Sequence, residues 1–193
     1  TDAVVTLSDD PDLTELKQLN AATTGAIKIN TQSKTYSGSA SDLAAALAGT
    51  VTNNAGAALS GAMTVSDNDN TAVAATDLSL IGGATSGTVT VTHAVAISGT
   101  ASELKAALVT PASKVDVSDA AVTISDGDNT SIAASDLSDI GSATTGTVTV
   151  THAINVTGTA DQAVVALHTA GSKVEVTDAV VTLSDDPDLT ELK

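Results

Sequence analysis

The sequence predicts an α/β fold, a repeat solenoid of short strands and short helices with about two strand–helix half-units in each 59-residue repeat. Three observations lead to this prediction. Long segments recur at a fixed spacing, and apolar residues alternate with polar ones in short runs. Each run is followed by a short segment that has helix-start signals and apolar residues four positions apart.

The repeat is clearest in the middle of the chain. Residues 87–108, "GTVTVTHAVAISGTASELKAAL", align without gaps with residues 146–167, "GTVTVTHAINVTGTADQAVVAL", and the offset is 146 − 87 = 59 positions. Residues 66–87 match residues 125–146 at the same offset, whereas the first copy is more divergent and carries a short deletion. The sequence therefore predicts a single array of units: 1–58, 59–117, 118–176 and a partial unit, 177–193.

The string "TDAVVTLSDDPDLTELK" occurs twice, at residues 1–17 and at residues 177–193. The two copies are 177 − 1 = 176 positions apart, which is the summed length of the three units. Neighbouring units differ at many positions, so independent drift would not leave these strings identical. We therefore expect a second, longer repeat and a parent array that extends beyond this chain; identical ends added by engineering are the alternative.

Each unit divides into two half-units. The first step, from Val89 to Val115, is 26 residues and the second, from Val115 to Val148, is 33. The strand run of the first half-unit has the period-two pattern of a half-buried strand in Val89, Val91, Val95 and Ile97. His93 interrupts that apolar face, and Asp119 stands at the matching place in the other half-unit. The apolar phase slips by one residue after Asp119, which predicts a bulge or corner.

The helical segments begin with recognisable caps. Thr100 with Glu103, and Thr159 with Gln162, have capping-box spacing, and Ser39 with Asp42 is a weaker version. In the other half-unit Asp10 is expected to cap a helix whose first residue is Pro11. Inward-facing stripes are predicted at Leu13, Leu16 and Leu19, at Leu43 and Leu47, and at Leu104 and Leu108. Such short helices need neighbours, so stacking of half-units is expected.

Composition excludes several classes of protein. Seven lysines stand against 23 carboxylates, for a formal charge of −16, which opposes binding to nucleic acid or to an anionic membrane surface. No apolar run is long enough to predict membrane insertion. Cysteine is absent, and the only aromatic residue is Tyr36. A core of small branched side chains suits thin layers at a fixed spacing.

Several strings resemble the degenerate tandem repeats of giant bacterial cell-surface proteins, especially those of marine cyanobacteria. They are "AATTGAIKI" (21–29), "GTVTVTHA" (87–94), "GTASELKAAL" (99–108), "VDVSDA" (115–120) and "VEVTDA" (174–179). The resemblance covers nearly the whole chain and implies a corkscrew-like α/β solenoid with an extracellular or cell-surface location. It brings no catalytic residues. The first unit departs from the pattern at residues 31–37, "TQSKTYS", where the histidine is replaced.

Acidic loops recur along the chain and suggest calcium, a hard cation that takes oxygen ligands. The candidate metal residues are Asp67, Asp69, Asp77, Asp126, Asp128 and Asp136. Neither the EF-hand spacing nor the glycine-rich nonapeptide that binds calcium is present. Aspartate also favours turns and helix caps without any metal, and this structural interpretation is preferred. No other cofactor is expected.

A polar column is the second candidate: His93, Asp119, His152 and Asp178. Direct stacking of half-units would make a titratable histidine–aspartate ladder. Corner residues that bond to the local backbone are the simpler interpretation. Nucleophilic catalysis requires a positioned serine, histidine and aspartate, and the chain has no Gly-x-Ser-x-Gly elbow. The sequence therefore does not predict an enzyme.

The string "TVTVT" at residues 88–92 and 147–151 is the third candidate, because a flat array of threonines can bind ice. The matching outward positions carry Lys28, Asp116 and Glu175, which would interrupt such an array. Threonine is also a common solvent-facing strand residue. Ice binding is therefore the weakest of the functional alternatives.

The sequence predicts a structural spacer or scaffold segment of a long secreted or cell-surface tandem-repeat protein. Its expected partners are neighbouring repeats of the same protein, together with head-to-tail self-association through unpaired strand edges. A calcium-dependent adhesin module that uses the acidic loops is the alternative from a different functional class.

Overall fold

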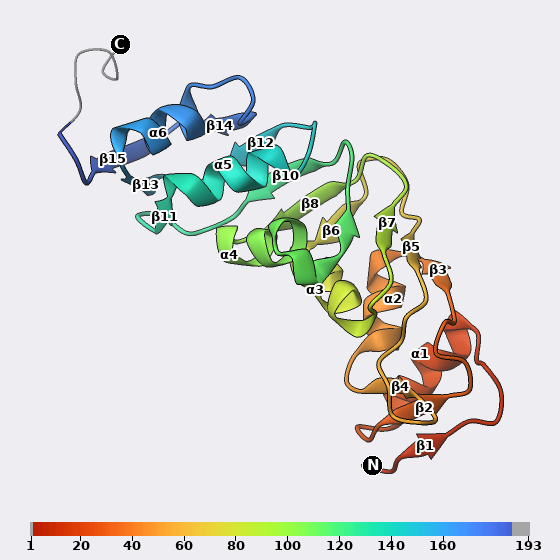
Figure 1. Ribbon diagram of the computed structural model, residues 1–193. Coiled ribbons are helices and arrows are strands. Elements are labelled where there is room, and N and C mark those ends of the chain that lie inside the picture. The colour runs from red at the N-terminus through yellow and green to blue at the C-terminus, as the bar shows by residue number, and fades with distance from the viewer. Residues whose placement is uncertain (1, 187–193) are drawn as a thin grey trace.

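The computed structural model describes residues 2–186. Short parallel sheets lie beside a row of short helices, and the first and last elements, β1 and β15, lie at opposite ends of an elongated molecule (Figure 1). The helices of the described part are α1 (Leu13–Ala22), α2 (Ala40–Leu47), α3 (Ala75–Ala84), α4 (Ala101–Leu104) with its π-helical continuation η1 (Lys105–Val109), the 3₁₀ turn η2 (Pro111–Ser113), α5 (Ala134–Ser142) and α6 (Ala160–Leu167).

The helices begin largely as their caps predict. Both predicted capping boxes are present, at the start of α4 and of α6, and Ser39 accepts a hydrogen bond from the Asp42 amide at the start of α2. The prediction for the first helix was wrong. Asp12, not Asp10, is its N-cap, because Asp12 forms a reciprocal capping box with Glu15, which stands at the third helical position. Pro11 consequently lies before the helix.

The strands form four parallel sheets within the described residues. One sheet contains β1 (Val5–Thr6), β2 (Ile27–Ile29) and β4 (Val51–Asn53). The next contains β3 (Tyr36–Gly38), β5 (Met63–Val65), β7 (Val89–Val91) and β9 (Val115–Asp116). The third has the order β6 (Ala72–Ala74), β8 (Ala96–Gly99), β10 (Ala121–Ile124), β12 (Val148–Val150) and β14 (Val174–Val176). The last contains β11 (Ser131–Ala133), β13 (Ile154–Gly158) and β15 (Ala179–Leu183).

Between two paired strands the chain forms one helix and, except between β1 and β2, one other strand. Val89 pairs with Val115, as the first predicted half-step requires. The second half-step is not a pairing distance: Val148 pairs instead with Val122, and β9 has no strand beyond it in its sheet. The predicted run from Val89 to Ile97 is also two strands, because the chain turns a corner at His93, whose carbonyl accepts from the Val95 amide at 2.9 Å.

The four sheets contain three, four, five and three strands, and their first strands do not begin at a fixed spacing. β1 and β3 begin the first two sheets at Val5 and Tyr36. β6 and β11 begin the other two at Ala72 and Ser131, which are 131 − 72 = 59 positions apart. Neighbouring strands lie about 4.8 Å apart, whereas packed helices need about 8 to 10 Å, so the strands and the helices differ in their packing distance.

One apolar core runs along the molecule between the helices and the sheets. Successive helices pack against each other from α1 to α6, and the leucines predicted to face inward do so, with Leu16, Leu43 and Leu104 fully buried. Lys17 of α1 pairs with Asp42 of α2, and Lys105 of η1 pairs with Asp136 of α5. Each segment is thus held mainly by the segments next to it in the chain.

Candidate functional sites

Two of the predicted metal residues cap helices that lie earlier in the chain. The carboxylate of Asp67 accepts the Ala40 amide at 2.6 Å, and that of Asp126 accepts the Ala101 amide at 2.6 Å. Ala40 and Ala101 are the first residues of α2 and α4, where backbone amides have no partner inside the helix. Asp185 does the same for Ala160 of α6 at 2.8 Å. These aspartates therefore join one helix to the strand segment that follows about 25 residues later.

The other four predicted metal residues either accept hydrogen bonds from backbone amides or lie on separate helices. Asp69 and Asp128 accept the amides of Ala94 and Ala153, both at 3.1 Å. Asp77 lies in the first turn of α3, and Asp136 in the first turn of α5. Within residues 2–186 no three histidine, cysteine or acidic side chains gather closely enough to hold a metal ion. Calcium binding stays a prediction, with no assembled cluster to support it.

Two ion pairs tie neighbouring helices and shift the pKa of one group each. A hydrogen bond from Lys17 holds the pKa of Asp42 below its ordinary value, with Ser39 adding to the effect. The hydrogen bond to Asp136 raises the pKa of Lys105. Both pairs are partly exposed, so each adds little to stability.

The histidines of the predicted polar column bond locally. The ring Nδ1 of His93 lies 3.0 Å from the hydroxyl of the adjacent Thr92, and His152 has the same arrangement with Thr151. Asp119 accepts from its neighbour Ser118 at 3.2 Å. These corner residues bond to the side-chain hydroxyl of an adjacent residue, whereas the simpler interpretation of the sequence expected bonds to the local backbone.

The predicted threonine array is only two residues wide in each sheet. Thr90 of β7 is in register with Thr64 on one side and with Asp116 on the other. Thr149 of β12 lies between Thr123 and Glu175 in the same way. An acidic side chain therefore stands at one end of each pair of threonines.

The structure also shows a recurring joint that the sequence reasoning missed. Three buried threonines each donate their hydroxyl to a carbonyl 20 to 24 positions earlier: Thr23 to Ala3 at 2.6 Å, Thr85 to Gly61 at 2.7 Å and Thr144 to Ala120 at 2.6 Å. The same hydroxyls accept the amides of Gly25, Gly87 and Gly146, each at 3.0 Å. The signal was the spacing Thr-x-Gly, which is present at residues 23–25, 85–87 and 144–146.

The glycine of each joint is required by close packing. A side chain at Gly146 would overlap the carbonyl of Ala120, and one at Gly25 would overlap the carbonyl of Ala3. Adjacent chain segments therefore touch backbone to backbone at this point. We call the threonine, the glycine and the carbonyl that they contact the Thr-x-Gly joint.

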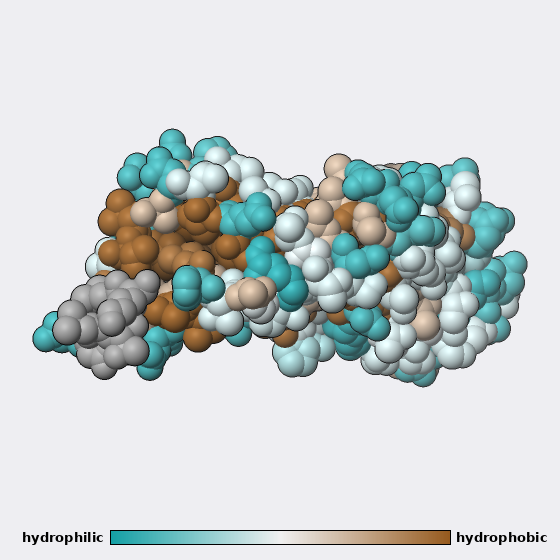
Figure 2. Space-filling model, turned by 90° about the horizontal axis from the view of Figure 1, so that it is seen from above, coloured by the Kyte–Doolittle hydropathy of each residue, from teal (hydrophilic) through white to brown (hydrophobic). Residues whose placement is uncertain are grey.

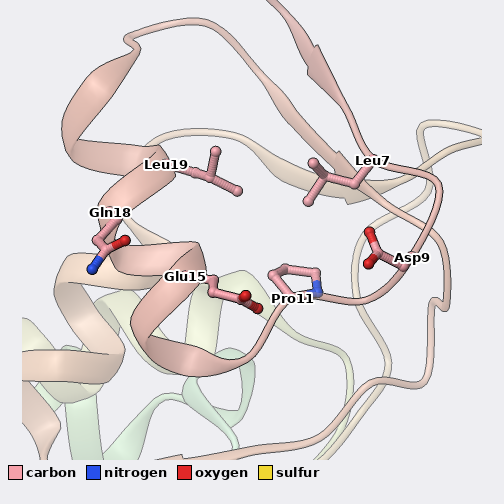
Figure 3. A pocket seen from close by; sticks show the side chains of 6 residues that line it. All are labelled: Leu7, Asp9, Pro11, Glu15, Gln18 and Leu19. Carbon is pink, nitrogen blue, oxygen red and sulfur yellow. The ribbon is translucent and has the colours of Figure 1, made fainter.

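A shallow hollow lies at the N-terminal end of the molecule. Figure 3 shows Leu7 and Leu19 facing each other across it, with Glu15 and Gln18 projecting from α1 and with Asp9 and Pro11 on the preceding loop. Glu15 is already used in the capping box of α1. The other polar groups of the lining are the carboxylate of Asp9 and the amide of Gln18.

The C-terminal end presents an apolar surface. Figure 2 shows hydrophobic side chains gathered there, beside the grey atoms, where α6, β14 and β15 lie. A second hollow at this end is lined mainly by apolar residues, among them Leu167, Val176 and Val181. Val181 is 43 % exposed. We call the outer edge of β15, together with these three side chains, the C-terminal face.

No family model, curated protein or solved structure matches this chain. None of the helices in the described residues has the length and hydrophobicity that crossing a bilayer requires. What the structure itself defines is a mixed α/β protein whose repeated polar contacts join one part of the chain to the next.

Proposed function

We propose that this chain is a repeat solenoid and that it serves as a structural spacer of a long cell-surface protein. One observation carries the proposal: the Thr-x-Gly joint recurs at Thr23, Thr85 and Thr144, and each joint links a segment only to the segment before it. A chain held by nearest-neighbour contacts lengthens when units are added, without a change in fold. The cell-surface location rests on the resemblance to giant tandem-repeat proteins.

The polar groups are used in a way that suits a spacer. The carboxylates of Asp67, Asp126 and Asp185 each cap a helix that begins about 25 residues earlier. These carboxylates therefore hold neighbouring segments of the chain together. The formal charge of −16 opposes side-by-side contact between such rods. In this proposal the stacked units set the length and the stiffness of the parent protein.

The experiment compares this chain with a chain in which residues 1–176 are followed by a second copy of residues 1–193. Small-angle scattering should show a maximum dimension that grows by nearly the length of one copy, while the radius of the cross-section stays the same. A double-length chain that instead becomes thicker, or whose two halves move independently, would contradict the proposal.

A further inference from the structure

We propose that this chain self-associates end to end by strand exchange, with the C-terminal face of one copy taking the place of residues 2–10 of the next. In the assembly, β15 of one copy pairs along its outer edge with β2 of a second copy, whose own β1 is displaced. The inference rests on the stacked architecture proposed above. Its test measures the oligomeric state and not the length of a rod, so either proposal can fail alone.

The first support is a series of backbone hydrogen bonds with one member missing. The Val5 amide donates to the Ala26 carbonyl at 2.9 Å, which joins β1 to β2. The corresponding amides of Met63 and Val122 donate to Thr88 and Thr147, also at 2.9 Å. Val181 is next in this series, because 122 + 59 = 181, and it lies in β15, the last strand of its sheet.

The Val181 amide faces away from the partner that β15 already has. The Ser184 amide donates to Gly158 at 2.9 Å, and the Asp178 carbonyl accepts from Ile154 at 3.3 Å. Both contacts point toward β13. Because alternate residues of a parallel strand bond to opposite neighbours, the odd-numbered residues 179, 181 and 183 face outward. These are the positions that correspond to 3, 5 and 7 of β1 and its flanks.

The side-chain hydrogen bonds of the Thr-x-Gly joint indicate the same replacement of the first segment by the last. Its carbonyls are those of Ala3, Gly61 and Ala120, and the next position in this series is Ala179, since 120 + 59 = 179. In the proposed assembly the Thr23 hydroxyl of the second copy donates to Ala179. Asp186 corresponds to Asp10, whose carboxylate accepts the Thr31 amide at 2.7 Å. In the assembly Asp186 takes the place of Asp10 in this contact.

The sheets at the two ends complete each other. The sheet at the C-terminal end has the order β11-β13-β15, and the sheet at the N-terminal end has the order β1-β2-β4. Replacing β1 by β15 gives β11-β13-β15-β2-β4, which has the same number of strands as the complete sheet β6-β8-β10-β12-β14. The exchange therefore builds a sheet that the molecule already contains.

The lengths of the strands indicate which segment is displaced. β1 contributes only two residues to its ladder with β2, whereas β15 pairs with β13 over five. Val4, which precedes β1, is 60 % exposed. The longer ladder of β15 stays intact while its outer edge gains a strand, and the C-terminal face (Figure 2) becomes covered.

The test uses the same substitution at both copies of the shared string. Val181→Pro removes the outward amide of β15 without touching the bonds to β13, and proline is tolerated on an edge strand. Val5→Pro removes the amide that holds β1 on β2. The two variants have the same mass and charge, and circular dichroism checks that both are folded. Sedimentation velocity over a concentration series then measures association.

We expect the unmodified chain to form concentration-dependent linear oligomers. Val5→Pro should associate about fivefold more tightly and Val181→Pro about fivefold more weakly, the effect of one backbone hydrogen bond. Equal behaviour of the two variants would overturn the proposal. So would a chain that remains monomeric both unmodified and with Val5→Pro.

A cross-link identifies the contact directly in this cysteine-free chain. Thr6 and Lys28 are paired residues of β1 and β2, and Thr182 corresponds to Thr6. A full chain with Lys28→Cys and Thr182→Cys should give a ladder of disulfide-linked species on oxidation, whereas either single variant can give dimers at most. A double variant that yields no species beyond dimers would overturn the proposal even if the proline variants fail to fold.

Discussion

The hydroxyl of Thr144 donates to the main-chain carbonyl of Ala120, which is 2.6 Å away and 24 positions earlier in the chain. The same hydroxyl accepts the Gly146 amide at 3.0 Å, so one buried side chain satisfies a donor and an acceptor of two adjacent segments. A buried polar group with both partners in place stabilises, and removal of its hydroxyl leaves both partners unsatisfied.

Thr144→Val should therefore destabilise the protein by about 1 to 3 kcal/mol, because a methyl group replaces the hydroxyl and leaves the two backbone groups buried. Chemical denaturation measures the change in the free energy of unfolding. The control is Thr149→Val, since Thr149 lies partly exposed in β12. Its expected change is within about 0.5 kcal/mol. Equal effects of the two substitutions would show that the joint does not hold the segments together.

Adjacent glycines in α3 should respond in opposite directions to alanine. A side chain at Gly82 would overlap the Ser113 carbonyl, whereas one at Gly83 meets nothing within 4 Å. Gly82→Ala is expected to cost about 1 to 3 kcal/mol by overpacking. Gly83→Ala should stabilise by about 0.5 to 1 kcal/mol, because alanine loses less conformational entropy in a helix. Thermal melting of both variants checks the sign, and two changes of the same sign would contradict the packing described here.

Local signals in the sequence predicted much of the local structure. Thr100 and Thr159 cap their helices as expected, because a capping box depends only on residues three positions apart. The first helix was mispredicted because "SDDPD" offers several aspartates, and only the reciprocal bond with Glu15 selects Asp12. Where local signals compete, the sequence alone does not choose between them.

The half-unit spacing predicted only part of the strand pairing. Val115 and Val148 occupy matching places in the sequence, yet Val148 pairs with Val122. The choice between these partners depends on how the strands and helices of the whole molecule pack, which no short segment specifies. For Asp67 and Asp126 the sequence favoured turns and caps but did not identify the helices, since each aspartate caps a helix that begins more than 20 residues before it.

Replacement of the Asp126 carboxylate should distinguish a cap from a calcium ligand. Asp126→Ala removes the partner of the first amide of α4 and is expected to cost about 1 kcal/mol, the same with calcium as with a chelator. Asp116→Ala, at an exposed position in β9, is the control and should change little. The measurement is thermal melting of the three proteins in both conditions.

A different result would favour the adhesin alternative. If calcium raised the melting temperature of the unmodified chain by many degrees, and Asp126→Ala removed that increase, the acidic loops would bind the ion. The spacer proposal expects the two melting curves of the unmodified chain to coincide.

Tyr36 should give the protein a pH dependence in the alkaline range. Its side chain is 4 % exposed and its hydroxyl donates to the Pro11 carbonyl at 3.3 Å. Burial raises the pKa of Tyr36 from 10.0 to about 12, with smaller contributions from the charges of Asp10 and Asp12. The neutral phenol is therefore favoured by folding. Its contribution to stability is complete below the unfolded pKa and is lost as the pH rises from 10.0 to about 12.

Because Tyr36 is the only aromatic residue, ultraviolet absorbance of tyrosinate reports its ionisation alone. The folded chain should titrate well above a denatured sample of the same protein. Tyr36→Phe keeps the ring but cannot ionise, so its free energy of unfolding should fall less steeply than that of the unmodified chain across this range. The remaining slope belongs to the lysines, which both proteins share. Identical titration of the folded and denatured protein, or parallel stability curves for the two chains, would show that the phenol lies in water and does not pack beneath Pro11.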